Sequence, residues 1–459
     1  MLQLLKSDKP GLGVVYFAGA APTAAAIAKR LRATGMQAVP SEKGRGKSDW
    51  AFGLCDEKHG SAIVLLEPEP PPVWGFLQFA RGLTEQEAAA AQTGTSAVLV
   101  VVPAENDDVL RDRKRLLWFM RQVMSDDAVL AVDLASRMPW SRAALDDELS
   151  HDAALDVEAL YVCHAVQCRP DRVGWLHTHG LAELGGFDID ILRPDPWLVR
   201  TANDPLRALA FAIVGGQIAA DTESYALANP GGKVRLLPVA EVMSRASAAD
   251  KALRAMGPDT GDPHVADRAV VCEPRASSSA LADVPAPSRL LTHPPDGTTL
   301  AFGDEAAEMM AERARGTVGV LRALLDEFAD YPVVPTAKLQ FPFLDSGASE
   351  LIPCQIHSVH EDTIDCTLTG QPTGLPIREG LRTTFSLNRL VDWTILSPEG
   401  DMTPRSLLGA RRLRELPAEL RDELIALKRN EIEARHRRAL ELVEAFARSR
   451  AVKVRSSAR

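Results

Sequence analysis

Apolar and polar positions in the N-terminal part of the chain follow two periods, one typical of strands and one typical of helices. Apolar runs at Gly13–Ala18 and Ala97–Val102 predict buried strands. Each run precedes a segment with apolar residues at helical spacing, Pro22–Ala33 and about Asp107–Val123. Strands that alternate with helices favour an α/β domain in which helices cover a sheet.

The pattern then changes to strands with short connections. Trp50–Leu54 and Ala62–Leu66 flank a polar turn and predict a hairpin. Three further β-rich segments predict an antiparallel meander attached to the same sheet: Ala159–Val166, Val173–Thr178 and Phe187–Leu192. An apolar segment that follows them predicts a buried helix. We therefore place one α/β domain over residues 1–245.

A change of composition divides the chain. Residues 246–300 are rich in Ala, Ser, Pro and Asp, which is typical of a flexible linker. Asp304–Ala329 has helical spacing, and short strands separated by turn residues follow it. Residues 301–416 therefore predict a small β-rich α+β domain flanked by helices. Apolar positions from about Pro417 to Phe446 predict a closing helix within a basic C-terminal segment, residues 417–459.

Part of the second domain resembles a known family. The resemblance is carried by Ala337–Phe343 (AKLQFPF), Leu368–Pro372 (LTGQP), Gly380–Phe385 (Gly-x-x-Thr-Thr-Phe) and Asp392-Trp393. These segments resemble the YegJ-like domain of unknown function, family 2314. Upstream, Gly174–Leu181 (GWLHTHGL) resembles the uncharacterised family 4026, whose members carry a YegJ-like unit at the C-terminus. Neither resemblance implies an activity.

Composition and charge are those of an ordinary globular protein. Hydrophobic residues make up 46% and charged residues 25%, and 52 basic against 62 acidic residues give a net charge of −10. An acidic chain disfavours nucleic acid as a partner. The N-terminus lacks the pattern of a secretory signal, the apolar runs are too short to span a bilayer, and the six cysteines lack paired spacing. We expect a soluble cytoplasmic protein with no membrane partner.

The most specific candidate for chemistry is a His-x-His pair. His177 and His179 lie two apart in a predicted strand, so both imidazoles lie on one face and can bind one metal ion. Asp190 stands eleven residues later, a spacing that resembles the JAMM class of zinc metallopeptidases. The serine and the proline of that class are absent. The sequence thus predicts a zinc site of His177, His179 and Asp190, with Asp188, on the same strand face as Asp190, as another candidate for the third ligand. The alternative is that both histidines only pack and form hydrogen bonds.

A zinc hydrolase also needs a general base, for which Glu148, Glu158 and Glu183 are candidates. The chain lacks a complete phosphate-binding fingerprint and a nucleophile elbow, so the sequence supplies neither a cofactor site nor a catalytic residue. Our leading hypothesis is therefore a non-enzymatic binding or regulatory protein. Its basic C-terminal helix is a candidate for binding a protein partner, and the alternative is that this helix covers its own domain. The alternative function is a zinc-dependent hydrolase that uses His177, His179 and Asp190.

Overall fold

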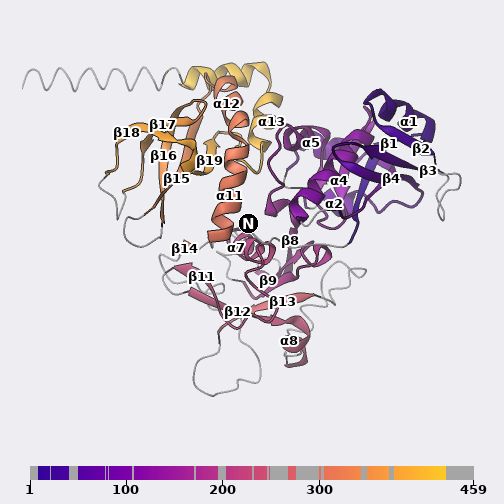
Figure 1. The fold of residues 1–459 in the computed structure, drawn as a ribbon, viewed down its shortest axis with the longest axis horizontal. Coiled ribbons are helices and arrows are strands. Elements are labelled where there is room, and N and C mark those ends of the chain that lie inside the picture. Colours follow the sequence, from indigo (N-terminus) through magenta and orange to yellow (C-terminus); the bar gives the residue numbers. More distant parts are fainter. Residues whose placement is uncertain are drawn as a thin grey trace, which may run out of the picture. The chain divides into compact units, whose positions relative to one another are not determined.

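The computed structural model shows a mixed α/β protein with two compact units, Met1–Gly316 and Thr317–Arg459. It describes residues 9–430 except for 21, 41–49, 78, 81, 106–107, 170–171, 195–202, 230–231, 246–247, 249–266, 275–298, 301–303, 343–348, 372–376 and 429. Figure 1 follows the chain from the indigo strands of the first unit to the orange strands of the second. Each unit is built around its own sheets.

The first sheet of the N-terminal unit has the strand order β2-β3-β4-β5-β1-β6-β7, and all of its neighbours are antiparallel. Its strands are β1 (Gly11–Ala18), β2 (Gln37–Pro40), β3 (Ala51–Asp56), β4 (Gly60–Glu67), β5 (Gly94–Val102), β6 (Ala128–Asp133) and β7 (Pro139–Trp140). Its helices are α1 (Ala24–Ala33), α2 (Trp74–Leu77), α3 (Glu85–Ala91), α4 (Val109–Val123) and α5 (Arg142–Leu149). The predicted hairpin of β3 and β4 is confirmed.

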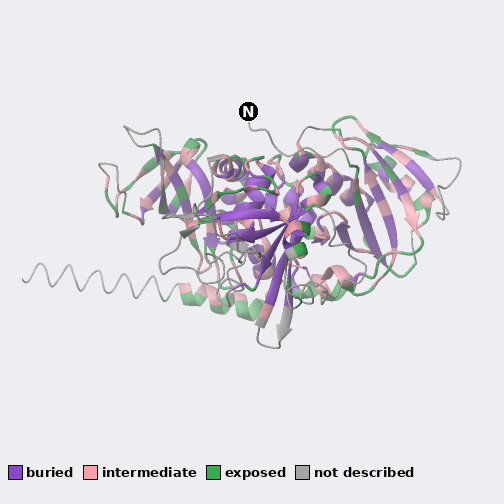
Figure 2. Ribbon diagram, turned by 90° about the horizontal axis from the view of Figure 1, so that it is seen from below, coloured by how far each residue is buried: buried purple, intermediate pink, exposed green. Residues whose placement is uncertain are grey.

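β1 is buried on both faces, which explains its continuous apolar run. Val15 and Phe17 belong to the large core that contains α1 and α4, whereas Val14 and Tyr16 belong to a smaller cluster on the opposite face. Gly13 allows α4 to approach closely, because a Cβ at this position would collide with the sulfur of Met120. Figure 2 shows how much of the strands is buried.

The second sheet has the strand order β14-β11-β12-β13-β10-β9-β8. Its strands are β8 (Val162–Arg169), β9 (Arg172–His179), β10 (Asp188–Leu192), β11 (Tyr225–Asn229), β12 (Gly232–Pro238), β13 (Arg268–Cys272) and β14 (Thr299–Leu300). β8, β9 and β10 form the predicted antiparallel meander. The prediction that they join the first sheet was wrong: the first sheet ends at the two-residue strand β7, and β8, β9 and β10 belong to the second sheet. α7 (Asn203–Val214) belongs to the core that the two sheets share.

The predicted linker contains a core strand. β13 lies between β12 and β10, antiparallel to the first and parallel to the second, and all five of its residues are buried. The interpretation of residues 246–300 as linker was therefore wrong for residues 268–272, whose apolar run Ala-Val-Val-Cys is short but sits in the centre of a sheet. α8 (Val239–Arg245) precedes this segment, and α11 (Asp304–Gly316) follows it within the first unit. Most of the intervening predicted linker lies outside the described residues.

The C-terminal unit contains one antiparallel sheet with the order β18-β17-β16-β15-β19. Its strands are β15 (Val334–Pro342), β16 (Ser349–Val359), β17 (Thr363–Leu368), β18 (Arg382–Ser386) and β19 (Leu390–Leu396), and its helices include α12 (Val318–Glu327) and α13 (Leu408–Glu415). The indole N–H of Trp393 donates to the hydroxyl of Thr317, which precedes α12, at 3.0 Å. The helix predicted over Asp304–Ala329 is thus divided at Thr317.

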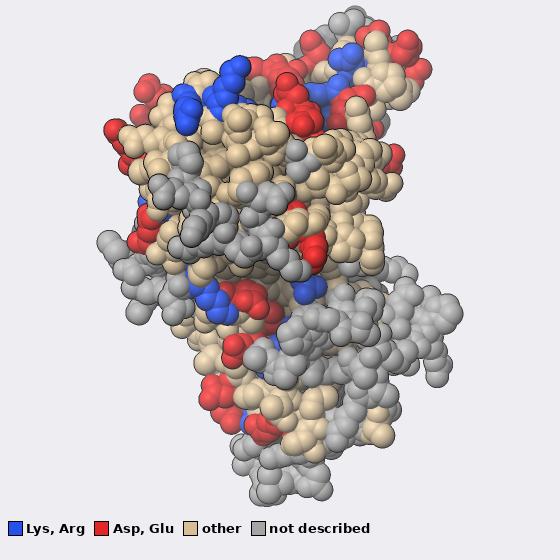
Figure 3. Space-filling model, turned by 90° about the vertical axis from the view of Figure 1, so that its right-hand side faces the viewer, with Lys and Arg blue, Asp and Glu red and all other residues tan. Residues whose placement is uncertain are grey.

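The predicted closing helix is described only in its first part. Residues 418–428 are helical, and the rest of the predicted helix lies outside the described residues. No helix in the part of the chain that the structure describes is long and apolar enough to cross a bilayer. On the face drawn in Figure 3, acidic and basic side chains are interspersed among uncharged ones. Free thiols are found at Cys55, Cys163, Cys272, Cys354 and Cys366.

Candidate metal centre

Three histidines meet on one face of the second sheet. His177 and His179 are two residues apart on β9, so their side chains point to the same face. On the neighbouring strand β8, His164 stands directly opposite His177 in the antiparallel register. Directly opposed residues of an antiparallel pair share a face, so the imidazole of His164 joins the other two.

The three imidazoles converge. One potential ligand atom from each of His164, His177 and His179 lies within 4.8 Å of the others. The ring centroids are 4.8–5.0 Å apart, and the ring planes are nearly perpendicular to one another. A zinc ion bound at about 2.0–2.1 Å in tetrahedral geometry holds its ligand nitrogens about 3.4 Å apart. Small side-chain rotations therefore suffice to bring these three histidines onto one ion.

Aromatic packing fixes the orientation of two of the rings. Phe79 stacks on His164 with ring centroids 4.2 Å apart, and Trp175 stacks on His177 at 3.9 Å. Trp175 is fully buried, and the three histidines are 0–8% exposed. Buried, stacked imidazoles lose little side-chain entropy when they bind an ion, because their rotamers are already restricted.

Asp190 belongs to the same face but is committed to an ion pair. It pairs with His177 in the register between β9 and β10 and is fully buried. Its Oδ1 accepts hydrogen bonds from Nε and Nη2 of Arg268 on β13, at 3.0 and 2.7 Å. The structure thus brings His177 and His179 together with His164, while Asp190 holds the guanidinium of Arg268.

Asp188 anchors the turn that follows the histidines. Its Oδ1 accepts hydrogen bonds from the hydroxyl of Thr178 at 2.9 Å and from the backbone N–H of Leu181 at 3.2 Å. Burial raises the pKa of Asp188, although Arg268 nearby opposes this rise. The carboxyl group thereby ties β9 to β10 next to His179.

Gly180 makes the turn after His179 feasible. Its φ of 128° lies in the region that glycine favours, and a Cβ at this position would collide with the carbonyl oxygen of Leu160. The same Cβ would lie 3.0 Å from the Cα of Ser136, in the segment between β6 and β7. The backbone after His179 therefore packs directly against a loop of the first sheet.

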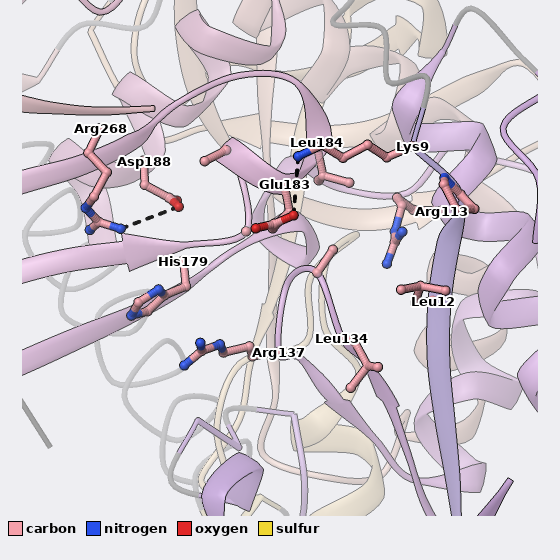
Figure 4. A pocket seen from close by; sticks show the side chains of 14 residues that line it. Lys9, Leu12, Arg113, Leu134, Arg137, His179, Glu183, Leu184, Asp188 and Arg268 are labelled. Atoms are coloured by element: carbon pink, nitrogen blue, oxygen red, sulfur yellow. Dashed lines mark hydrogen bonds and ion pairs between the residues drawn. The ribbon is translucent and has the colours of Figure 1, made fainter. Parts of the chain in front are cut away.

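A pocket of about 390 Å³ opens beside His179. Its wall combines the end of β9 and the 3-10 turn Ala182–Leu184 with residues that precede β1 and follow β6. Figure 4 shows His179 on this wall, with Asp188 and Arg268 on one side and Lys9 and Glu183 on another. One ring of the histidine cluster thus also borders a space in which a small molecule fits.

The three candidate general bases lie in different places. Glu148 binds Arg313 at 2.7 Å, and Glu158 binds Arg207 at 2.7 Å, so both carboxylates serve ion pairs away from the pocket wall. Glu183 lies on the pocket wall with an exposed side chain, 3.4 Å from the ammonium of Lys9. Among these candidates, Glu183 is the one that shares the pocket with His179.

His164 is the residue that reasoning from the sequence missed. It lies in a segment that was predicted as a strand, but nothing local distinguishes it from any other histidine in a strand. Its proximity to His177 follows from the register of β8 on β9, which includes irregularities at Gln167. Counting back from the pair Arg169–Arg172 places His164 opposite His177, because the two irregularities cancel, so a tight hairpin at this point is the signal that could have found His164.

No profile of a known family, no curated protein and no solved structure matches the chain. The resemblances to the YegJ-like domain and to family 4026 therefore stay predictions.

Proposed function

We propose that the N-terminal unit binds a zinc ion through His164, His177 and His179 and uses it for hydrolysis in the adjoining pocket. The observation that carries this proposal is the convergence of three buried imidazoles within 4.8 Å, one of which, His179, also lines a pocket of about 390 Å³. Three imidazoles are a ligand set that suits zinc, and three protein ligands leave one coordination position for water or substrate.

The chemistry that zinc supplies in such a site is a lower pKa of bound water and a polarised substrate carbonyl or phosphoryl group. The residues of this chain supply the rest. The stacked rings of Phe79 and Trp175 orient two of the ligands, and the turn held by Asp188 positions the third. We assign the role of general base to Glu183, because it is the one of the three candidate glutamates that lines the pocket.

The first test measures metal. Protein purified without a nickel resin and then dialysed against zinc should retain about one zinc per chain. Single changes of His164, His177 and His179 to Gln should each abolish most of this binding, and circular dichroism checks that the variants fold. His357→Gln is the matched control, because this histidine is exposed on the other unit and bonded to Thr367. Zinc content near zero in the unaltered protein would end the proposal.

The second test separates a catalytic site from a binding site. Zinc-loaded protein is assayed against ester, amide and phosphoester panels, and Glu183→Gln should lower any turnover while zinc content stays the same. Full zinc occupancy without turnover of any substrate would favour the other hypothesis, a non-enzymatic binding or regulatory protein in which the metal stabilises a binding site. That the C-terminal helix binds a protein partner is a further proposal, which the zinc experiments do not test.

A further inference from the structure

The pocket beside His179 has an excess of basic side chains. Its wall carries four of them, Lys9, Arg113, Arg137 and Arg268, against the two carboxyl groups of Glu183 and Asp188, a formal charge of +2. The protein as a whole carries −10, so this wall has the opposite sign to the molecule. A concave wall of one sign concentrates ligands of the other sign.

Carboxylates outside the pocket wall hold two of its three guanidinium groups in place. Asp133 binds Arg113 through Nε at 2.9 Å, and Asp190 binds Arg268 through Nη2 at 2.7 Å. Both arginines are at most 4% exposed. These ion pairs neutralise much of the charge that the two arginines bring, so they hold the wall in shape more than they attract a ligand.

Arg137 also lines the pocket. It lies at the tip of the segment between β6 and β7 and adopts a φ of 58°, which is uncommon for a residue with a side chain. In Figure 4 its guanidinium extends to the side of the pocket on which His179 and Arg268 are drawn. Left-handed backbone at a non-glycine residue costs free energy and is concentrated at functional sites.

The conformation of this loop is held by several bonds. Oδ1 of Asp133 accepts a hydrogen bond from the backbone N–H of Ala135 at 3.0 Å, and the hydroxyl of Ser136 accepts one from the N–H of Met138 at 3.3 Å. Asp133 is the same carboxylate that binds Arg113. The buried Ser136 also packs against Gly180, directly after His179. One network thus fixes Arg137 relative to the histidine cluster.

We infer that this pocket binds an oxyanion, the phosphate or carboxylate group of a small molecule, with Arg137 as the residue that recognises it. Arginine presents paired N–H donors that match the oxygens of both groups. This assigns a substrate class to the proposed hydrolase. The hydrolysis of such a substrate rests on the proposed function, whereas binding of the anion to the pocket needs no metal.

Calorimetric titration of the full-length, metal-free protein with inorganic phosphate, and separately with acetate, tests the inference. We expect Arg137→Asn to weaken the binding of the preferred anion at least tenfold, because Asn tolerates positive φ and lacks the guanidinium. Arg193→Asn is the matched control, since Arg193 has a φ of 50° and does not line the pocket, and it should leave the affinity unchanged.

Phosphate and acetate distinguish a phosphate ligand from a carboxylate ligand. Binding of either anion supports the inference if Arg137→Asn weakens that binding. Binding that requires added zinc and is unaffected by Arg137→Asn would overturn it, because the anion would then bind the metal rather than the pocket. Lack of binding of both anions at millimolar concentration would also overturn it. Zinc content is measured on the same preparations, so failure of the metal site is seen independently.

Discussion

His164 and His177 face each other across β8 and β9, with ring centroids 4.9 Å apart and ring planes at 86°. His164 precedes His177 by thirteen residues, and only the register of the two strands brings them together. This pair turns an isolated His-x-His into a cluster of three.

His164 should matter as much for metal binding as the two histidines on β9. We expect His164→Gln to lower zinc affinity by a factor of about 100 or more, because a two-histidine site lacks the third ligand that zinc sites require. Competition with a chromophoric chelator measures the affinity. Retention of zinc affinity in His164→Gln, together with its loss in His177→Gln, would show that the third ligand is another residue.

Asp190→Asn should act on stability rather than on metal binding. The change leaves the buried guanidinium of Arg268 without its main counter-charge, which we expect to cost about 3–5 kcal/mol of unfolding free energy. Denaturant unfolding measures the loss, and zinc content is determined on the folded protein. The double change Asp190→Asn with Arg268→Met should recover part of the stability. Zinc loss without destabilisation would instead make Asp190 a ligand, as the sequence predicts.

His151 should make the stability of the first unit depend on pH. Burial lowers the pKa of His151 from 6.5 to about 4, and the nearby Lys114 and Arg313 add to the effect although Glu148 opposes it. The folded state then binds fewer protons than the unfolded state between these values. The contribution of the neutral His151 to the free energy of unfolding is complete above pH 6.5 and is lost as the pH falls toward 4.

The expected loss is about 1–2 kcal/mol after allowance for solvent screening of this partly exposed side chain. Unfolding free energies at several pH values between 7 and 4 measure it. His151→Gln is the control, because a side chain that does not titrate should flatten the dependence in this window. An equal slope in both proteins would contradict this assignment.

In the C-terminal unit, Thr317→Val should destabilise the fold by about 1–3 kcal/mol. Valine has nearly the same shape as threonine but leaves the buried indole N–H of Trp393 without its acceptor. Thr336→Val is a milder comparison, because that hydroxyl donates to the carbonyl of Thr394 at a partly exposed position. Tryptophan fluorescence during denaturation follows both variants. Equal, small effects would mean that water satisfies the indole.

The elements with strong local patterns could be predicted from the sequence, but their assignment to sheets could not. β1, β5 and α4 carry long apolar or amphipathic runs and were found within a few residues of their ends. β13 was missed because four apolar residues inside an Ala- and Pro-rich segment give a weak local signal. Its place between β12 and β10 is a non-local property that no short pattern encodes.

The candidate site could be predicted only in part for the same reason. His177 and His179 share a face because strand periodicity is local, and this inference needs no tertiary information. His164 joins them by cross-strand register, and Asp190 is directed to Arg268 by a strand from the segment that was predicted as linker. The spacing that suggested Asp190 as a ligand contains no information about that competing arginine.

X-ray absorption at the zinc K-edge identifies the ligands of the bound ion. For protein purified without a nickel resin and loaded with one equivalent of zinc, we predict three imidazole nitrogens and one oxygen at about 2.0–2.1 Å. We also predict that the number of imidazole ligands falls in His164→Gln. A shell with sulfur ligands, a shell with fewer than three imidazoles in the unaltered protein, or zinc that remains fully hydrated would rule out a zinc site of His164, His177 and His179.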